Sequence, residues 1–553
     1  MSDEKPSKKD PMIPDGEVNP IDTDYKVGQD NIIVNVGPFG LDIHNPVFGI
    51  AGGLVVLFVA LTLGFHDQVE TLFSSMKDWL TGNLDGFFLV AGNFFVLFCL
   101  VIAFSPLGRV RLGGTEAKPD YTYLGWFSML FAAGMGIGLM FFGVSEPLTH
   151  FGTALGGVEV VDGVRTDWAP LGAAAGDAEA AARLGMAATI YHWALHPWAI
   201  YAVLALGLAL FSFNKGLPLT VRSVFYPILG ERIWGWPGHV IDILAVLATL
   251  FGLATSLGFG AAQASSGLNF LFDVPLGIPT QIVLIIGITA IALFSVVSGL
   301  DAGVKRLSEI NMLLALLLLL FVIAVGPTLN ILSGFFANLG AYFEYLPALS
   351  NPIGREDSNF LQGWTAFYWA WWISWSPFVG MFIARVSRGR TVREFIVSVL
   401  LVPSLACTLW MTVFGETAIR QVVESGYAAA RDADLPLQLF MMLDALPLAQ
   451  ITSFLAIVLV VVFFVTSSDS GSLVIDVISA GGKVDAPVPQ RVFWAVFEGI
   501  VAIVLILSGG LVALQAMSVS TGLPFALVLL VSCIAIFKGL MSEPRPKKIR
   551  KLA

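Results

Sequence analysis

Stretches of about 20 mostly apolar residues recur along the whole chain, and no other feature limits its fold as strongly. Examples lie at 46–65, 87–104, 282–297, 312–325 and 454–465. A helix of this length and composition crosses a bilayer, and about twelve such stretches can be counted. The chain is 56% hydrophobic and only 13% charged, whereas soluble proteins average roughly 25% charged residues. The sequence therefore predicts an all-α polytopic membrane protein with about 12 transmembrane helices.

The distribution of Lys and Arg predicts the orientation of these helices, because cytoplasmic loops carry an excess of both residues. With an inside N-terminus and alternating sides, 24 of the 30 Lys and Arg residues fall inside and 6 outside. Acids such as Glu146, Asp177 and Glu179 are assigned to the outer loops. Both termini are thus expected in the cytoplasm. The expected spans lie near 46–66, 86–106, 122–145, 188–213, 237–260, 279–298, 308–333, 364–386, 394–415, 450–477, 492–509 and 512–537.

The same pattern divides the chain into three regions. Residues 1–44 are polar and charged, and we expect a disordered cytoplasmic tail there. Residues 45–537 form the expected transmembrane domain, and residues 538–553 form a short basic cytoplasmic tail. Between two spans, residues 335–349 are short and amphipathic, which is typical of a helix that lies in the membrane interface.

Two of the expected spans contain residues that interrupt helices. Glycines alternate over 134–138 in the third span, and each costs about 1 kcal/mol relative to alanine in a helix. Pro377 in the eighth span removes one backbone hydrogen bond. The glycines alone are explained more simply by close helix packing. Two interruptions five spans apart instead fit an inverted repeat, spans 122–333 and 364–537, with a binding site at the interruptions.

Aromatic rings gather in the fourth and eighth spans, over 191–201 and 364–375. Trp near the end of a span usually belongs to the interfacial belt, and we expect this of Trp364. Trp372 and Trp375 lie deeper. Each ring face attracts a desolvated quaternary ammonium ion by about 2 kcal/mol or more. Because few ionisable residues lie in these spans, the pattern favours a permanent cation, and amides of an interrupted glycine segment would suit the carboxylate of a zwitterion.

Two other patterns contain residues that can bind metal ions. His192 and His196 are four residues apart, but Trp193 stands where a metalloprotease motif needs Glu, and a third ligand is not apparent. We expect structural hydrogen bonds there, which leaves an intramembrane enzyme as a distant alternative. The run 466–471, TSSDSG, follows a long apolar stretch. Its hydroxyls could cap a helix end or coordinate Na⁺, a hard cation that prefers oxygen, and the residues alone leave both open.

Several segments resemble the betaine/choline/carnitine transporter family: GMGIGLM at 134–140, HWALHPWAIY at 192–201, WAWWISWSPFVGMFIARVSRGRTVR at 369–393, and the tenth-span VTSSDSGS. The resemblance extends over about residues 45–540, and the eighth-span motif is highly specific. It implies a bacterial inner-membrane transporter rather than an enzyme. It also implies a LeuT-like inverted repeat of five helices plus five, with two extra N-terminal helices, usually in a homotrimer.

The resemblance also implies site residues. The family's aromatic box corresponds here to Trp193, Trp198, Tyr201 and Trp372, with Trp371, Trp375 and Phe378 along the path. The glycine segment near the substrate comprises Ala133, Gly134, Met135, Gly136 and Gly138. The main sodium site corresponds to carbonyls of Ala132, Met135 and Phe463 and hydroxyls of Thr466 and Ser467. A second sodium site corresponds to Thr249 and Phe378, but Leu253 replaces a hydroxyl ligand there.

The expected function is Na⁺-coupled uptake of a betaine-like zwitterion by alternating access, with Na⁺ as coupling ion and no cofactor. Betaine-type members of the family resemble this chain at Gly138, where choline-type members tend to have an acid. Glycine betaine is therefore the expected substrate. Dimethylsulfoniopropionate has similar charge and bulk, and it stays an alternative, as do choline and carnitine.

Overall fold

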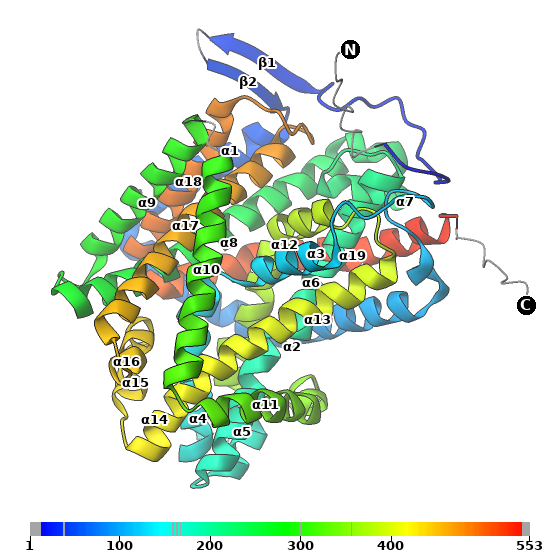
Figure 1. Ribbon diagram of the computed structural model, residues 1–553. Helices are drawn as coiled ribbons and strands as arrows, with labels where there is room; N and C mark the ends of the chain where they lie inside the picture. Colours follow the sequence, from blue (N-terminus) through cyan, green and yellow to red (C-terminus); the bar gives the residue numbers. More distant parts are fainter. Residues whose placement is uncertain are drawn as a thin grey trace, which may run out of the picture.

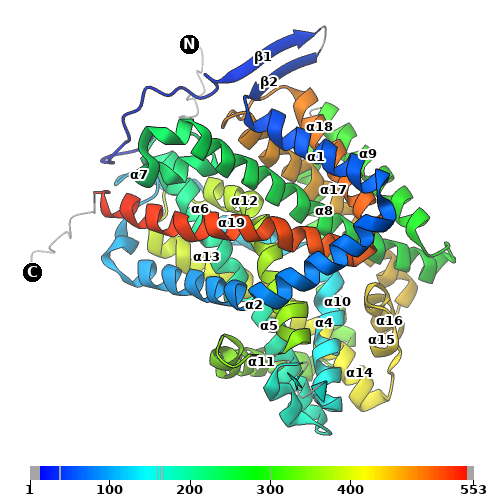
Figure 2. The same cartoon turned by 180° about the vertical axis from the view of Figure 1, so that it is seen from behind.

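The computed structural model describes residues 13–36, 39–157, 160–161, 164–165, 167–298, 301–355 and 357–544. These residues are almost entirely helical, and the long helices lie side by side in one bundle (Figures 1 and 2). The strands are confined to two short antiparallel pairs, β1 (Asn31–Val36) with β2 (Phe39–His44) and β3 (Val160–Val161) with β4 (Val164–Arg165). An all-helical polytopic membrane protein is thereby confirmed.

Ten helical segments of the described residues are long and apolar enough to cross a membrane, and one bent pair gives an eleventh. The ten are α1 (Val47–Gly64), α2 (His66–Phe104), α5 (Ala178–Trp193) with α6 (Leu195–Ala209), α8 (Trp236–Phe272), α9 (Ile278–Ser298), α10 (Asp301–Val325), α13 (Val392–Met411), α17 (Ala449–Ser479), α18 (Val488–Leu507) and α19 (Gly510–Met541). The bent pair is α3 (Tyr123–Gly134) and α4 (Ile137–Gly156).

The remaining helices connect or flank these segments. They are α7 (Tyr226–Leu229), α11 (Thr328–Leu349), α12 (Ala366–Val386), α14 (Thr417–Ser425), α15 (Ala429–Asp432) and α16 (Gln438–Asp444). Short 3₁₀ and π turns are η1 (Pro106–Arg109), η2 (Ala169–Ala174), η3 (Leu210–Asn214), η4 (Val221–Phe225), η5 (Gly230–Trp234), η6 (Ser358–Thr365), η7 (Thr412–Glu416) and η8 (Leu435–Leu437). Buried helices form the centre of the bundle, where α12 packs on α6, α8 and α19 and α17 packs on α8.

The glycine run of the third span interrupts its helix, as expected. Helix α3 ends at Gly134, α4 begins at Ile137, and the two are bent by 64°. Met135 and Gly136 between them are extended, and Gly136 provides no side chain to cap the first amides of α4. The interruption therefore leaves backbone groups free in the middle of the bundle.

The interruption expected at Pro377 is wrong. Helix α12 runs unbroken from Ala366 to Val386 with Pro377 inside it. Proline cannot donate to the carbonyl four residues earlier, that of Ile373. The hydroxyl of Ser376 donates to this oxygen at 2.6 Å instead. A neighbouring side chain thus satisfies the freed carbonyl, which is how proline is tolerated in membrane helices.

The N-terminal region differs from the expected disordered tail. Residues 31–36 and 39–44 form the β1–β2 hairpin, with Asn31 opposite His44, which projects from one end of the bundle (Figure 1). Before it, the amide of Asp15 donates to Gly113 at 2.8 Å, and the ring of Tyr25 stacks on Trp234 at 3.8 Å. Residues 1–12 of this tail, and 545–553 of the basic tail, lie outside the described residues.

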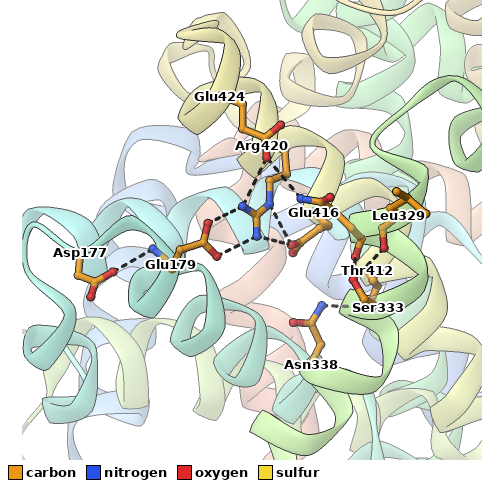
Figure 3. A network of polar contacts seen from close by, with 10 residues as sticks. Asp177, Glu179, Leu329, Ser333, Asn338, Thr412, Glu416, Arg420 and Glu424 are labelled. Atoms are coloured by element: carbon orange, nitrogen blue, oxygen red, sulfur yellow. Dashed lines mark hydrogen bonds and ion pairs between the residues drawn. The ribbon is translucent and has the colours of Figure 1, made fainter.

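The opposite end of the bundle is tied together by an arginine (Figure 3). Arg420 of α14 makes two hydrogen bonds to Glu179 of α5, at 2.5 and 3.0 Å, and two to Glu416, at 3.1 and 3.3 Å. Asn338 of α11 donates to Thr412 beside this group at 3.3 Å. The amphipathic helix expected at 335–349 is the second half of α11, which begins at Thr328 and packs on α5.

Candidate functional site

The α3–α4 interruption opens into a cavity of about 1010 Å³ in the centre of the bundle. Residues from α3, α4, α5, α6, α10, α12 and α17 line it. They include all the residues expected to contact substrate: Ala133, Gly134, Met135, Gly136, Gly138, Trp193, Trp198, Tyr201, Trp371, Trp372 and Trp375. Residues of the expected site that are far apart in the sequence, from Ala133 to Trp375, therefore line one cavity.

Four rings of the cavity form walls that stand almost at right angles. Trp193 and Trp372 have centroids 5.0 Å apart with an interplanar angle of 77°. Tyr201 lies 6.1 Å from Trp372 at 83°, and Trp198 lies 5.3 Å from Tyr201 at 74°. Ring faces carry the negative part of the aromatic quadrupole. An open box of such faces is the arrangement that attracts a quaternary ammonium ion.

The orientation of two of these rings is fixed by a helix interruption that was not expected. The chain leaves helical geometry at Ala194, between α5 and α6, with φ −99° and ψ −120°. The indole N–H of Trp372 donates to the carbonyl of His192 at 3.1 Å. The indole of Trp198 donates to the carbonyl of Trp193 at 3.3 Å, which lies four residues before Pro197 and lacks its amide partner. These two hydrogen bonds satisfy the carbonyls of His192 and Trp193 and fix the orientation of the rings of Trp372 and Trp198.

The glycine segment allows the backbone to approach the rings closely. A β-carbon on Gly138 would lie 2.9 Å from Cη2 of Trp193 and 3.1 Å from Cη2 of Trp371. A β-carbon on Gly134 would lie 3.1 Å from Trp198. Gly136, Ile137 and Gly138 line the cavity at the start of α4, which has no side-chain cap and is the positive end of the helix dipole. The cavity thus combines aromatic faces with a backbone site for an anion.

The residues of the expected main sodium site line the same cavity. They are Ala132, Met135, Phe463, Thr466 and Ser467. The hydroxyl of Thr466 contacts the carbonyls of Val462 and Phe463 at 3.0 and 3.2 Å. Helix α17 continues to Ser479, so the alternative that 466–471 caps a helix end is wrong. The expected ligands in this lining are carbonyl and hydroxyl oxygens, and oxygen ligands are what a hard cation requires.

The second expected sodium site is less complete. Phe378 lines the cavity, but Thr249 does not, and its hydroxyl donates to the carbonyl of Ala245 at 2.7 Å. Leu253 packs against Gly471, where a β-carbon would lie 2.3 Å from its Cδ1. An apolar side chain thus fills the space where the resemblance implied a hydroxyl ligand.

The cavity is open at one end and sealed at the other. It reaches Lys305 and Glu309 near the start of α10, whose side chains are 78% and 64% exposed. Beyond the box, Phe142 lies between the rings of Trp193, Trp371 and Tyr368, with centroids 5.5–6.1 Å apart. Phe142 is only 3% exposed. The tightly packed rings close the end of the cavity that lies away from α10's start.

Glu146 was wrongly assigned to an outer loop. It lies inside α4 and is fully buried. Its Oε1 lies 2.6 Å from Nδ1 of His192, and its Oε2 accepts from Trp193 at 2.7 Å and from Tyr368 at 2.6 Å. Sequence reasoning missed this burial, because the groups that surround the carboxylate come from α5 and α12. The ligand atoms of Glu146, His150 and His192 lie within 4.8 Å of one another, as metal ligands do. The carboxylate of Glu146, however, already accepts hydrogen bonds from Trp193 and Tyr368.

The two histidines singled out in the fourth span make hydrogen bonds, as expected. The second ring nitrogen of His192, Nε2, lies 2.9 Å from the hydroxyl of Thr365. The Nε2 of His196 lies 3.0 Å from Oδ1 of Asn93 on α2. Both residues therefore connect helices that surround the cavity.

Comparisons with known protein sequences agree with one another. The betaine/carnitine/choline family transporter profile matches residues 46–545. A glycine betaine/proline/choline transporter of Vibrio parahaemolyticus is 70% identical over 532 residues, 96% of each chain. Glycine betaine transporter 1 of the same organism is 54% identical, covering 94% of this chain and 97% of that one. A solved manganese transporter from Eremococcus coleocola is 14% identical, with a TM-score of 0.40 and coverage of 76% and 81%.

The close approach at Gly138 makes a testable prediction. Gly138→Ala should displace Trp193 or Trp371, because the new methyl group would lie 2.9 Å from the first ring. We expect the dissociation constant of tetramethylammonium to rise roughly tenfold, as for about 1.4 kcal/mol of lost binding energy. The measurement is quenching of tryptophan fluorescence in the purified protein. Gly152→Ala, on the same helix with open space around it, is the control. Equal affinity in the two variants would contradict the close approach.

Proposed function

The chain belongs to the betaine/carnitine/choline transporter family, and from this membership and the cavity we propose that it takes up glycine betaine together with Na⁺. The observation that carries the proposal is the box of Trp193, Trp198, Tyr201 and Trp372 beside the amides of α4. The box suits a trimethylammonium group, and the helix N-terminus suits a carboxylate. A zwitterion of this size can satisfy both at once.

Related substrates follow from the same geometry. The 70% identical relative is named a glycine betaine/proline/choline transporter, so we include proline and choline as second candidates. Choline uses the box but leaves the amides of α4 without an anion. Dimethylsulfoniopropionate and carnitine carry both charges and stay alternatives. We expect glycine betaine to bind more tightly than choline, because Gly138 provides space and amides rather than an acidic side chain.

The shape of the cavity supports alternating access. With both termini in the cytoplasm, as the Lys and Arg distribution indicates, the exposed start of α10 faces inside. The cavity is then open to the cytoplasm and closed outside by Phe142 and its neighbouring rings. We assign this arrangement to an inward-open state. Uptake requires the opposite arrangement, in which the rings separate and the α10 end closes.

Family membership supports the remaining architecture of the proposal. Helix α12 has 21 residues, enough to cross a bilayer. Counting α12 with the ten long segments and the bent pair gives the expected twelve spans, arranged as an inverted repeat of five plus five after two helices. We further propose that the protein is a homotrimer in the bacterial inner membrane, as the family resemblance implies.

Sodium is proposed to bind at the end of α3. Ala132, Met135, Thr466 and Ser467 all line the cavity, and their carbonyl and hydroxyl oxygens are the ligands we propose. Ala132 and Met135 flank the interruption that continues into Gly136 and Gly138. An ion that binds one geometry of this interruption more tightly than another shifts the population toward it. One sodium site is therefore supported by its oxygens, and Leu253 weakens the case for a second.

Trp372→Leu tests the box. Losing one desolvated cation–π contact costs about 2 kcal/mol, so the dissociation constant of glycine betaine should rise roughly 30-fold. Uptake by proteoliposomes and tryptophan quenching provide the measurement. The control is Trp494→Leu, which removes a buried indole outside the cavity lining. The N–H of this indole donates to Ser479. Normal transport by the Trp372→Leu variant would show that this ring contributes only to packing and does not hold the substrate.

Sodium coupling is tested by ion replacement and by Thr466→Val. Uptake driven by a Na⁺ gradient should stop when K⁺ replaces Na⁺. Thr466→Val keeps the shape of the side chain and removes one oxygen, so the half-saturating Na⁺ concentration should rise roughly tenfold. Thr521→Val removes a similar hydroxyl that bonds within α19, at Met517, and serves as the control. Uptake that is unchanged in K⁺ would refute the coupling.

A further inference from the structure

One buried carboxylate adjoins the aromatic box without belonging to its lining. Glu146 is fully buried in α4, two helical turns after Gly138. The ion pairs of the described residues give it only histidine partners, His192 at 2.6 Å and His150 at 3.4 Å, and neither lysine nor arginine. A charged group inside a membrane domain is costly, and such residues usually have a function. The fold must therefore gain something from an acid at this position.

Trp193 connects this acid to the cavity. Its indole N–H donates to Oε2 of Glu146 at 2.7 Å, while the far edge of the same ring lies over Gly138 and lines the cavity. Its face stands at 77° to Trp372. One rigid ring thus has the carboxylate at one edge and the candidate ligand position at the other.

Tyr368 makes a second connection through the same oxygen. Its hydroxyl donates to Oε2 at 2.6 Å, and its ring stacks on Trp372 with centroids 5.9 Å apart and an interplanar angle of 21°. Oε2 therefore holds two rings from different helices, and both rings pack on Trp372. Losing the acid would loosen Trp193, which is a wall of the box, and Tyr368, which supports a second wall, Trp372.

The charge of Glu146 also acts through the ring that it holds. A hydrogen bond to an ionised acceptor is shorter and about twice as strong as a neutral one. It draws the indole proton toward the acid and leaves more negative charge on the ring system. Cation–π attraction is electrostatic and grows with that charge. In a water-excluded site the carboxylate itself also favours a cation over a neutral group.

We infer that Glu146 is the positioning residue that gives the box its selectivity for a positive charge, acting through Trp193 and Tyr368. The inference rests on the proposed function and names what the site discriminates: a full positive charge, as opposed to the bulk and shape of three methyl groups. A neutral tert-butyl group has nearly the same size as trimethylammonium. It fills the box but gains nothing from the acid.

The test compares glycine betaine with 3,3-dimethylbutanoate, its uncharged-headgroup counterpart, in the purified full-length protein. Tryptophan quenching gives both dissociation constants in wild type, Glu146→Gln and Glu146→Asp. We expect Glu146→Gln to weaken betaine binding roughly tenfold, the usual factor for one charge-assisted hydrogen bond. Binding of 3,3-dimethylbutanoate should change less than about twofold, within the range of a neutral contact. Glu146→Asp keeps the charge and should restore part of the preference for betaine.

The matched control is Glu416→Gln, which neutralises another buried glutamate, one that pairs with Arg420 far from the box (Figure 3). The control should leave the ratio of the two constants unchanged. If Glu146→Gln weakens the binding of both ligands equally, Glu146 has a structural role alone and the inference is overturned. Unchanged binding of both ligands would overturn it as well. Because the ratio is taken within one protein, partial unfolding cancels. Wild-type protein that fails to bind betaine would contradict the proposed function itself, and the inference with it.

Discussion

Hydrogen bonds from indole N–H groups are the constraint on which the cavity depends. Four tryptophans that line it donate to fixed acceptors: Trp193 to Glu146, Trp198 to the carbonyl of Trp193, Trp372 to the carbonyl of His192 and Trp375 to the carbonyl of Gly252. Each indole has a single donor and no acceptor. Once that donor is satisfied by the protein, the ring offers a ligand only its faces, and faces attract cations. The indoles of the box therefore offer a ligand no free hydrogen-bond donor and present only their faces to its cationic group.

The interruptions of α3–α4 and α5–α6 make this arrangement possible. An unsatisfied backbone group inside a membrane costs several kcal/mol, so an interruption persists only where other groups satisfy it. At Ala194 the tryptophans do so. At the α3–α4 interruption the amide of Met135 donates to the carbonyl of Ala132 at 3.3 Å, and Gly136 lines the cavity without a capping side chain. We propose that substrate and Na⁺ bind the backbone groups that this segment leaves without partners. The two sites are then coupled through one stretch of backbone.

Much of this architecture could be predicted from the sequence. Apolar stretches located the membrane helices, the glycines at 134–138 located one interruption, and the aromatic runs located the rings. Three features could not be predicted, because each depends on a side-chain hydrogen bond that the sequence pattern does not reveal. Alanine is a good helix former, yet α5 ends before Ala194, where the distant indole of Trp372 donates to the carbonyl of His192. Proline breaks helices, yet Ser376 preserves α12. A glutamate near a span end looks like a loop residue, yet three helices bury Glu146.

The central claim, that the four-ring box holds the cationic centre, is tested most directly by locating that centre. Arsenobetaine replaces the quaternary nitrogen of glycine betaine with arsenic, whose anomalous scattering marks one atom in a crystal. The account predicts a single strong peak among the faces of Trp193, Trp198, Tyr201 and Trp372, with the carboxylate toward the start of α4. A peak near Lys305 and Glu309 at the open end of the cavity, with the box empty, would contradict it.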